Sequence, residues 1–321
     1  MKKYPLKLSY VTKTALWAGR RLKTDFNKES TYETVSESWE LSVRNDEMSC
    51  ITNGKACGMT LLEYFDTVGF DCVAPSFKKG DRFPLLVKLI DAADMLSIQV
   101  HPDDKYASEV EHDSGKTEMW YVVDACEGAS LIYGLRDGVS GEDFASAIRQ
   151  GRVGEVINTI PVKPGDTYFI PAGMLHAIGS GILIAEIQQN SDLTYRVYDF
   201  DRKDKDGNLR PLHVDKAIDV TRPYSEDEIN SVRFAKGEGL GVGECLANSE
   251  YFRVRRLSLT EKTKLSVSDE SFMSVLCIEG DGNIIFEGDR FPICKGDSYF
   301  LPARMGEFEV DGNMTLMLSE I

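Results

Sequence analysis

The amino-acid sequence predicts a mainly β fold arranged as two related domains. Most of the chain consists of short runs rich in Val, Ile, Phe and Tyr, separated by Gly, Pro and Asp turns, which is typical of a β-sandwich or barrel. A segment near the middle of the chain is repeated near the C-terminus. The length of 321 residues also exceeds the roughly 250–300 residues at which a single hydrophobic core stops growing.

Strand-like runs dominate, and helical patterns are confined to a few places. Ser140, followed by Glu142 and Asp143, resembles a capping box and predicts the start of a helix that Gly151 ends. Two further helices are expected at 155–159 and 213–220, so the helical segments lie near 140–159 and 211–220. The expected strands are 83–90, 95–100, 119–123, 130–135, 166–171 and 181–187.

The internal repeat predicts where the second domain lies. KPGDTYFIPAGMLH (163–176) matches CKGDSYFLPARMGE (294–307), and His176 falls on Glu307 in this alignment. No histidine lies in the second copy, so we expect it to have kept the fold and lost any metal site. The expected domains are a catalytic one at 1–235 and a degenerate one at 236–321.

Composition excludes several classes of function. The formal net charge of -15, with no basic run, disfavours nucleic acid and anionic membranes as partners. Seven scattered cysteines without a C-x-x-C spacing indicate neither a disulfide framework nor a thiolate zinc site. The N-terminal segment carries no apolar stretch typical of a signal peptide, and no later run reaches the ~20 apolar residues that span a bilayer. A soluble cytoplasmic protein is therefore expected.

A candidate metal site comes from two of the four histidines. Gln99 and His101 are two residues apart, so both side chains lie on one face of a strand. Glu118 opens the next expected strand, and His176 follows the turn after 166–171. Imidazole, carboxylate and amide donors suit zinc, although iron or manganese would also accept them. His112 and His213, in polar turn-like or helical stretches, are not expected to be ligands.

Several segments closely resemble type I phosphomannose isomerases, particularly the short bacterial form. The resemblance covers about residues 15–220, and one departure is Ala18, where the family has Gly. It is carried by ALWAGRRL (15–22), ESWELS (37–42), LSIQVHPDD (96–104), GKTEMWYV (115–122), GDTYFIPAGMLHAI (165–178), EIQQNSDLTYRVYDFDR (186–202) and RPLHVDKAIDV (210–220).

The resemblance implies a double cupin fold, one zinc ion per chain, and interconversion of mannose 6-phosphate and fructose 6-phosphate. The family's metal ligands correspond to Gln99, His101, Glu118 and His176. Its other active-site basic and acidic residues correspond to Lys88, Lys116, Glu186 and Arg196. Moving a proton between C1 and C2 through an enediol requires an electrophile, a base and a cation for the phosphate.

Roles within this set remain open at this point. Lys116 and Glu186 are the candidates for proton transfer, and Arg196 is the candidate for contact with the phosphate or the enediolate. Arg202 and Lys88 could also hold the phosphate, and Arg196 could instead pair with Asp199 or Asp201. The three tryptophans, Trp17, Trp39 and Trp120, are expected to be core residues.

Two other functions compete with the isomerase. A cupin metal site can serve oxidation or decarboxylation, for which iron or manganese would be expected, and a non-catalytic cupin can sense a sugar ligand. The expected partner is a small sugar phosphate, and the chain is expected to be a monomer or a small homo-oligomer. The sequence does not decide between mannose catabolism and polysaccharide precursor supply.

Overall fold

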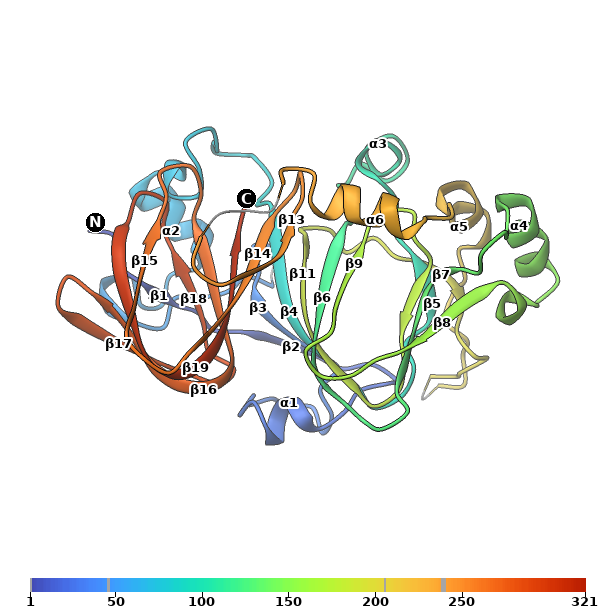
Figure 1. The fold of residues 1–321 in the computed structure, drawn as a ribbon, viewed down its shortest axis with the longest axis horizontal. Helices are drawn as coiled ribbons and strands as arrows, with labels where there is room; N and C mark the ends of the chain where they lie inside the picture. Colours follow the sequence, from blue (N-terminus) through green and yellow to red (C-terminus); the bar gives the residue numbers. More distant parts are fainter. Residues whose placement is uncertain (1, 45–46, 205, 238–240) are drawn as a thin grey trace.

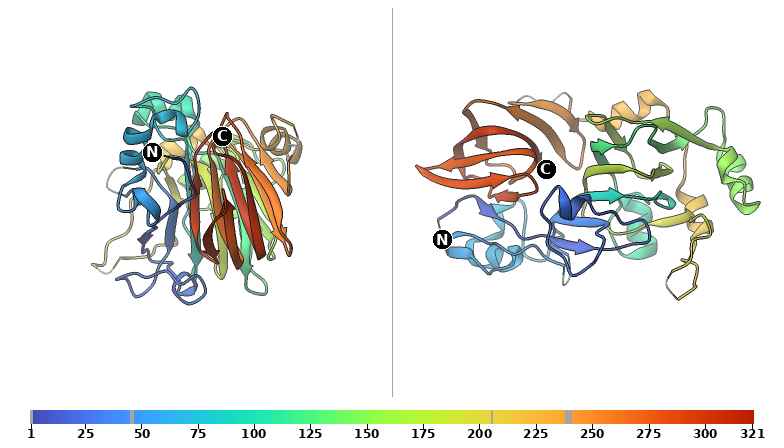
Figure 2. Two further views of the ribbon diagram at one scale, coloured as in Figure 1. Left: turned by 90° about the vertical axis from the view of Figure 1, so that its left-hand side faces the viewer. Right: turned by 90° about the horizontal axis from the view of Figure 1, so that it is seen from below.

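Two β-barrels lie side by side in the computed structural model, which describes residues 2–44, 47–204, 206–237 and 241–321. The first barrel is drawn mainly in green and yellow on the right of Figure 1, and the second in orange and red on the left. The helices lie at the ends and on the outside of the barrels (Figures 1 and 2). The predicted mainly β class with two related barrels is confirmed.

The first barrel consists of two antiparallel sheets. The six-stranded sheet has the order β2 (Val11–Lys13), β3 (Glu37–Leu41), β4 (Leu85–Ala92), β11 (Ile182–Gln189), β6 (Glu118–Ala125) and β9 (Thr167–Ile170). The five-stranded sheet has the order β12 (Tyr195–Tyr198), β5 (Ile98–Val100), β10 (His176–Ile178), β7 (Ser130–Leu135) and β8 (Ile157–Pro161). All six expected strands are present in this barrel, with ends shifted by a few residues.

The second barrel is one eight-stranded sheet that also takes a strand from the start of the chain. Its main path is β1 (Leu6–Lys7), β18 (Ser298–Leu301), β16 (Met273–Phe286), β19 (Gly306–Glu320), β14 (Arg253–Leu259) and β13 (Glu244–Asn248). Two further strands pair with this path, β15 (Thr263–Val267) with β19 and β17 (Asp289–Cys294) with β16. The N-terminal residues thus bridge the two barrels, because β1 pairs with β18.

The sequence repeat corresponds to the same turn in both barrels. Gly165 has φ +93° and Gly296 has φ +91°, a conformation that favours glycine. Asp166 Oδ2 accepts the backbone N–H of Lys163 at 3.0 Å, and the matching carboxylate in the second barrel accepts the N–H of Cys294 at 2.9 Å. Each turn leads into an equivalent strand, β9 or β18. The repeat therefore reports a duplicated structural unit.

Six α-helices are present in the described residues: α1 (Arg21–Thr24), α2 (Leu61–Val68), α3 (Asp104–Tyr106), α4 (Gly141–Arg149), α5 (Val214–Val220) and α6 (Glu226–Arg233). Ser140 and Asp143 form the predicted capping box of α4. Helices α2 and α6 were not predicted, although capping boxes open both, at Thr60 with Glu63 and at Ser225 with Glu228. None of the described helices is long and apolar enough to cross a membrane.

The prediction of a helix at 155–159 is wrong. A short 3₁₀ turn covers Val153–Glu155, and strand β8 then begins at Ile157. Ile157, Thr159 and Ile160 are β-branched, and pairing with β7 gives this segment a ladder that an isolated turn of helix would lack. Ala18 does not require the positive φ that would favour glycine, so the side chain is accommodated there.

Strand alternation separates the core from the site. On β5, Ile98 and Val100 face outward and pack in the hydrophobic cluster that includes Phe144 of α4 and Ala217 of α5. Gln99, between them, faces the interior of the barrel and lines a pocket there. The two helices therefore cover the outer face of the five-stranded sheet and leave its inner face to polar side chains.

Candidate active site

Three buried side chains from both sheets of the first barrel form a group that could hold a metal ion. His101 follows β5, Glu118 begins β6 and His176 begins β10, and their ligand atoms all lie within 4.8 Å of one another. Glu118 Oε2 is 3.6 Å from His101 Nε2, and Glu118 Oε1 is 3.4 Å from His176 Nε2. Gln99 pairs in register with His176, so its amide reaches the same point.

Hydrogen bonds fix which nitrogen of each imidazole faces the group. His101 Nδ1 lies 2.7 Å from the carbonyl oxygen of Leu193, and His176 Nδ1 lies 2.8 Å from that of Met174. Each Nδ1 therefore carries the proton, and each Nε2 presents a lone pair toward Glu118. Hydrogen bonds of this type hold an imidazole in the orientation that metal binding requires.

The polar atoms at the centre of the group are poorly satisfied. Among the described residues, no hydrogen bond reaches the buried His101 Nε2 or Glu118 Oε1, and Glu118 Oε2 has only one nearby donor, Lys116 Nζ, at 3.1 Å. Unpaired buried polar atoms of this kind are costly and require an explanation. A carboxylate and two imidazole nitrogens that converge with so few donors are the environment that a divalent cation would satisfy.

The electrostatics agree with this interpretation. Burial lowers the pKa of His176 to about 4 and lowers the pKa of His101 well below its ordinary value, with Lys116 and His176 adding to the second effect. Both imidazoles are therefore neutral near pH 7, which is the form that binds metals. Burial, together with Glu186, raises the pKa of Glu118 to about 7, because a carboxylate here lacks a sufficient counter-charge.

Gln99 completes the set only with its oxygen turned toward the histidine. Its Nε2 lies 3.4 Å from His176 Nε2, and its Oε1 lies 3.4 Å from Ser97 Oγ. Amide oxygen and nitrogen exchange places when the amide turns by 180°, and the hydrogen-bond network decides between the two orientations. In the orientation seen here the Gln99 N–H can donate to the lone pair of His176 Nε2, whereas the turned amide would point its oxygen inward and offer it to a cation.

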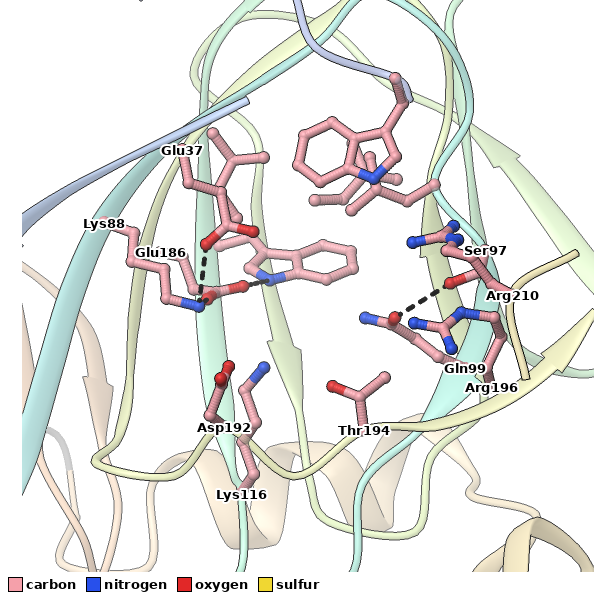
Figure 3. A pocket seen from close by; sticks show the side chains of 15 residues that line it. Glu37, Lys88, Ser97, Gln99, Lys116, Glu186, Asp192, Thr194, Arg196 and Arg210 are labelled. Carbon is pink, nitrogen blue, oxygen red and sulfur yellow. Dashed lines mark hydrogen bonds and ion pairs between the residues drawn. The ribbon is translucent and has the colours of Figure 1, made fainter. Parts of the chain in front are cut away.

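A pocket of about 330 Å³ opens beside this group, between the two sheets of the barrel. Figure 3 shows Glu37, Lys88 and Glu186 on one side of it and Ser97, Gln99, Arg196 and Arg210 on the other. Lys116 and Asp192 lie together at the lower edge of that view. The pocket thus has a side with mixed charges and a side with two arginines.

The mixed-charge side is built on neighbouring strands. Glu186 on β11 lies in register with Lys88 on β4 and with Trp120 on β6. Trp120 Nε1 donates to Glu186 Oε2 at 3.0 Å, and Lys88 Nζ lies 3.3 Å from Glu186 Oε1 and 3.4 Å from Glu37 Oε2. Burial alone would raise the pKa of Glu186, but Lys88 and Lys116 outweigh it and lower the pKa, so the carboxylate is ionised.

Lys116 stands between the metal-ligand candidates and the pocket. Its Nζ lies 3.1 Å from Glu118 Oε2, and the side chain is only 5% exposed. The residue also lines the pocket. Lys116, Glu118 and Trp120 alternate along the chain, so all three side chains face inward.

The arginine side consists of Arg196 on β12 and Arg210 in the segment after it. Arg196 pairs in register with Gln99, and its Nη1 donates to the carbonyl oxygen of Pro211 at 2.9 Å. Arg210 binds Asp199 through two nitrogens, Nε at 2.7 Å and Nη2 at 2.5 Å. The pairing of Arg196 with Asp199 or Asp201 does not occur among the described ion pairs, since Asp199 binds Arg202 and Arg210 instead.

Most of the predicted site residues meet around this pocket. Lys88, Lys116, Glu186, Arg196 and Gln99 all line it. Arg202 points elsewhere and donates to Asp199 and to the carbonyl oxygen of Met95. His112 is exposed with φ +55°, and His213 accepts the backbone N–H of Arg196, so neither joins the metal-ligand candidates.

Several residues of the pocket were missed from the sequence: Trp17, Glu37, Trp120, Asp192, Thr194 and Arg210. A signal existed for Trp120, because strand alternation from Glu118 puts it on the inner face. The expectation that Trp120 is a core residue is correct in part, since the side chain is 1% exposed and also binds Glu186. Arg210 gave no comparable signal, because it follows an irregular segment.

Comparisons with known proteins agree with the site. Residues 6–127 match the family model "Phosphomannose isomerase type I, catalytic domain", and residues 244–321 match "Mannose-6-phosphate isomerase, cupin domain". The chain is 37% identical to mannose-6-phosphate isomerase ManA of Bacillus subtilis, with 99% of both chains covered. It is 36% identical to mannose-6-phosphate isomerase of Streptococcus mutans, with 98% of both chains covered.

Solved structures give the same result. The crystal structure of mannose 6-phosphate isomerase from Bacillus subtilis matches with a TM-score of 0.87 at 36% identity, covering 99% of both chains. A mutant phosphomannose isomerase from Salmonella typhimurium matches with a TM-score of 0.78 over 98% of both chains, and at 14% identity this likeness concerns the fold alone. The full-length likeness at 36–37% identity shows that the chain belongs to the type I phosphomannose isomerases, an enzyme family with a cupin fold.

Proposed function

We propose that this chain is a zinc-dependent aldose–ketose isomerase that interconverts mannose 6-phosphate and fructose 6-phosphate through an enediol. One observation carries the proposal: the buried group of His101, Glu118 and His176 adjoins a pocket with an acid–base side and an arginine side. An isomerase of a phosphorylated sugar needs those three components together.

Gln99, His101, Glu118 and His176 would hold the metal ion. Two imidazole nitrogens with carboxylate and amide oxygens are donors that zinc accepts, and three or four protein ligands leave a coordination position for substrate. A bound divalent cation supplies Lewis-acid stabilisation for the negative oxygen that develops next to the reacting carbon. Neutral imidazoles, which the lowered pKa values of both histidines support, bind without first releasing a proton.

Lys116 and Glu186 would move the proton between C1 and C2. Glu186 is ionised and lines the pocket, and among the described residues its Oε1 has only the ion pair with Lys88 at 3.3 Å, so the carboxylate can take a proton from a bound substrate. Lys116 lines the same pocket and contacts Glu118, so an ammonium group lies close to the reacting end. Lys88 would keep Glu186 ionised, and Trp120 would orient it through its indole N–H.

Arg196 and Arg210 would bind the phosphate on the opposite side. A guanidinium group retains its charge and matches phosphate oxygens geometrically. Asp199 uses the Nε and Nη2 atoms of Arg210, which leaves Nη1 for another acceptor. Anchoring the phosphate there would fix C1 and C2 between Glu186 and the metal.

We further propose that 1–235 form the catalytic domain and that 236–321, which include the undescribed 238–240, form a degenerate cupin domain without a metal site.

An NMR assay of isomerisation tests the function. The protein is expected to convert mannose 6-phosphate to fructose 6-phosphate, and to convert unphosphorylated mannose far more slowly. Glu186→Gln, which is close in size but cannot take the proton, should lower kcat by about 100-fold or more. Equal turnover of mannose and its 6-phosphate would contradict the phosphate side of the pocket, and no turnover of either would contradict the reaction.

A further inference from the structure

Lys116 lies just outside the regular sheet, yet its backbone is held on both sides. Strand β6 begins at Glu118, and the last register pair between β6 and β11 is Glu118 with Gln188. The ladder that fixes Glu118 and Trp120 therefore does not extend to Lys116. A side chain that must reach a defined point in a pocket requires another means of support.

Three consecutive backbone N–H groups provide that support. The N–H of Gly115 donates to Asp104 Oδ1 at 2.8 Å, and the N–H of Thr117 donates to Gln189 Oε1 at 2.8 Å. Between them, the N–H of Lys116 donates to the carbonyl oxygen of Pro102 at 3.0 Å. The peptide after Lys116 is thus bonded to the Gln189 side chain, the peptide before it to the Pro102 carbonyl, and the next peptide back to the Asp104 side chain.

The two supporting side chains are bonded to each other. Gln189 Nε2 donates to Asp104 Oδ1 at 3.1 Å, and the backbone N–H of Gln189 donates to the carbonyl oxygen of Thr117 at 3.0 Å. Gln189 is the last residue of β11 and is only 8% exposed. The side chain and backbone of Gln189 therefore bind Thr117 just beyond the last register pair of the two strands, where the regular ladder has ended.

The space around Gly115 shows how closely the segment that carries Lys116 approaches the backbone of Asp103 and Asp104. A Cβ atom at this position would lie 2.5 Å from the backbone nitrogen of Asp104 and 2.6 Å from the carbonyl carbon of Asp103. Both neighbours are backbone atoms, which cannot move aside as a flexible side chain could. The segment that carries Lys116 is therefore pressed directly against the start of α3.

We propose that Gln189 and Asp104 are positioning residues that hold Lys116 in place for proton transfer. The inference rests on the proposed function, because it takes Lys116 to act on the substrate. Gln189 accepts from one side of Lys116, Asp104 accepts from the other, and the bond between them closes the loop. Loss of Gln189 releases the N–H of Thr117 and loss of Asp104 releases the N–H of Gly115, so in either case the backbone on one side of Lys116 is freed and the Lys116 amine loses its fixed position beside Glu118. Neither residue is among the metal-ligand candidates or the residues that line the pocket.

Steady-state kinetics on mannose 6-phosphate, together with metal content, test the inference. In Asp104→Ala and Gln189→Leu, kcat should fall about 10- to 100-fold, the cost of a small misplacement, while KM stays within about twofold. Metal content should match the wild type. Asp104 is exposed, so its substitution leaves the core intact. Asp104→Asn keeps an oxygen that can accept both bonds, and should restore at least half of the wild-type kcat.

Two controls separate positioning from general damage. Glu109→Ala removes another exposed carboxylate of the same helical segment and should leave kcat unchanged. In the described part of the chain, Glu109 makes no side-chain hydrogen bond to 115–117. In a Lys116→Ala background, Gln189→Leu should lower kcat no further, because the group that it positions is absent.

The outcomes distinguish this inference from the proposed function. Wild-type kcat in Asp104→Ala and Gln189→Leu, with a strongly lowered kcat in Lys116→Ala, would overturn the positioning role and leave the role of Lys116 intact. An additive loss in the Lys116→Ala background, or a loss of metal in the single variants, would also overturn it. Wild-type kcat in Lys116→Ala would instead remove Lys116 from the mechanism, and the inference with it.

Discussion

Lys88 and Glu186 lie directly opposite each other on β4 and β11, with Nζ 3.3 Å from Oε1 and both side chains buried. Burial alone would lower the pKa of Lys88, but Glu37 and Glu186 outweigh it and raise the pKa. The pair therefore consists of an ammonium and a carboxylate in a low-dielectric pocket, where each keeps the other charged. This relationship determines the protonation state of the proposed base.

Replacing Lys88 should change the pH dependence of the reaction. In Lys88→Met, Glu186 loses the cation that most lowers its pKa, so its pKa should rise. A base whose pKa rises becomes protonated at higher pH. The acidic limb of the pH profile of kcat/KM should therefore shift to higher pH. Lys79→Met, which removes an exposed lysine paired with Asp66, is the control and should leave the profile in place. An unshifted limb in Lys88→Met would argue against Glu186 as the base.

The two arginines should contribute to substrate binding and not to metal binding. Arg196→Met and Arg210→Met each remove a charged donor on one side of the pocket, so KM for mannose 6-phosphate should rise about 10- to 100-fold, as expected for loss of one charge-assisted hydrogen bond. Metal content should be unchanged. Initial-rate kinetics combined with elemental analysis check both statements, and an unchanged KM in both variants would exclude this side as the phosphate site.

Removal of either buried histidine should release the metal. His101→Ala and His176→Ala each delete one nitrogen donor, and we expect less than about a tenth of the wild-type zinc after dialysis, since each ligand contributes strongly to affinity. His112→Ala removes an exposed histidine and should retain full zinc. Inductively coupled plasma mass spectrometry gives the content directly. Full occupancy in both His101→Ala and His176→Ala would place the metal elsewhere.

Asp199 should make stability depend on pH. Burial alone would raise its pKa, but hydrogen bonds from Arg210 and Arg202 outweigh it and lower the pKa. A lowered folded-state pKa means that the contribution to stability is complete above the unfolded pKa of about 4 and is lost as pH falls further. Asp199→Asn should therefore cost about 2 kcal/mol at pH 7, as for hydrogen bonds to a charged group. This cost should shrink as the pH falls below about 4 toward the lowered folded-state pKa of Asp199.

Thermal unfolding of both proteins between pH 3 and pH 8 measures this difference. Asp137→Asn is the control, because Asp137 is exposed and forms no ion pair with the described residues. A cost for Asp199→Asn that does not change with pH would mean that its bonds to the arginines do not depend on its charge.

Much of the fold and the centre of the site could be predicted from the sequence. Strand alternation puts Gln99 and His101, and also Glu118, on inner faces, and the repeat locates the second barrel through the turns at Gly165 and Gly296. These features depend on local periodicity and turn chemistry, which a sequence displays directly.

The rest depends on tertiary contacts that have no local pattern. Arg210 reaches the pocket because Asp199 holds it, and the spacing of the two residues predicts no such pair. Strand β8 forms because β7 offers it a ladder, which overrides the helical interpretation of 155–159. The bond between Asp104 and Gln189 joins residues 85 positions apart. Such contacts become visible only when the barrel is closed.

The central claim is that a metal held by His101, Glu118 and His176 is required for isomerisation of mannose 6-phosphate. The most direct test strips the protein with a chelator, removes the chelator, and measures conversion to fructose 6-phosphate before and after one equivalent of zinc is added. We predict loss of activity on stripping and its recovery with zinc, in step with the bound metal. Undiminished conversion by the metal-free protein would contradict the account.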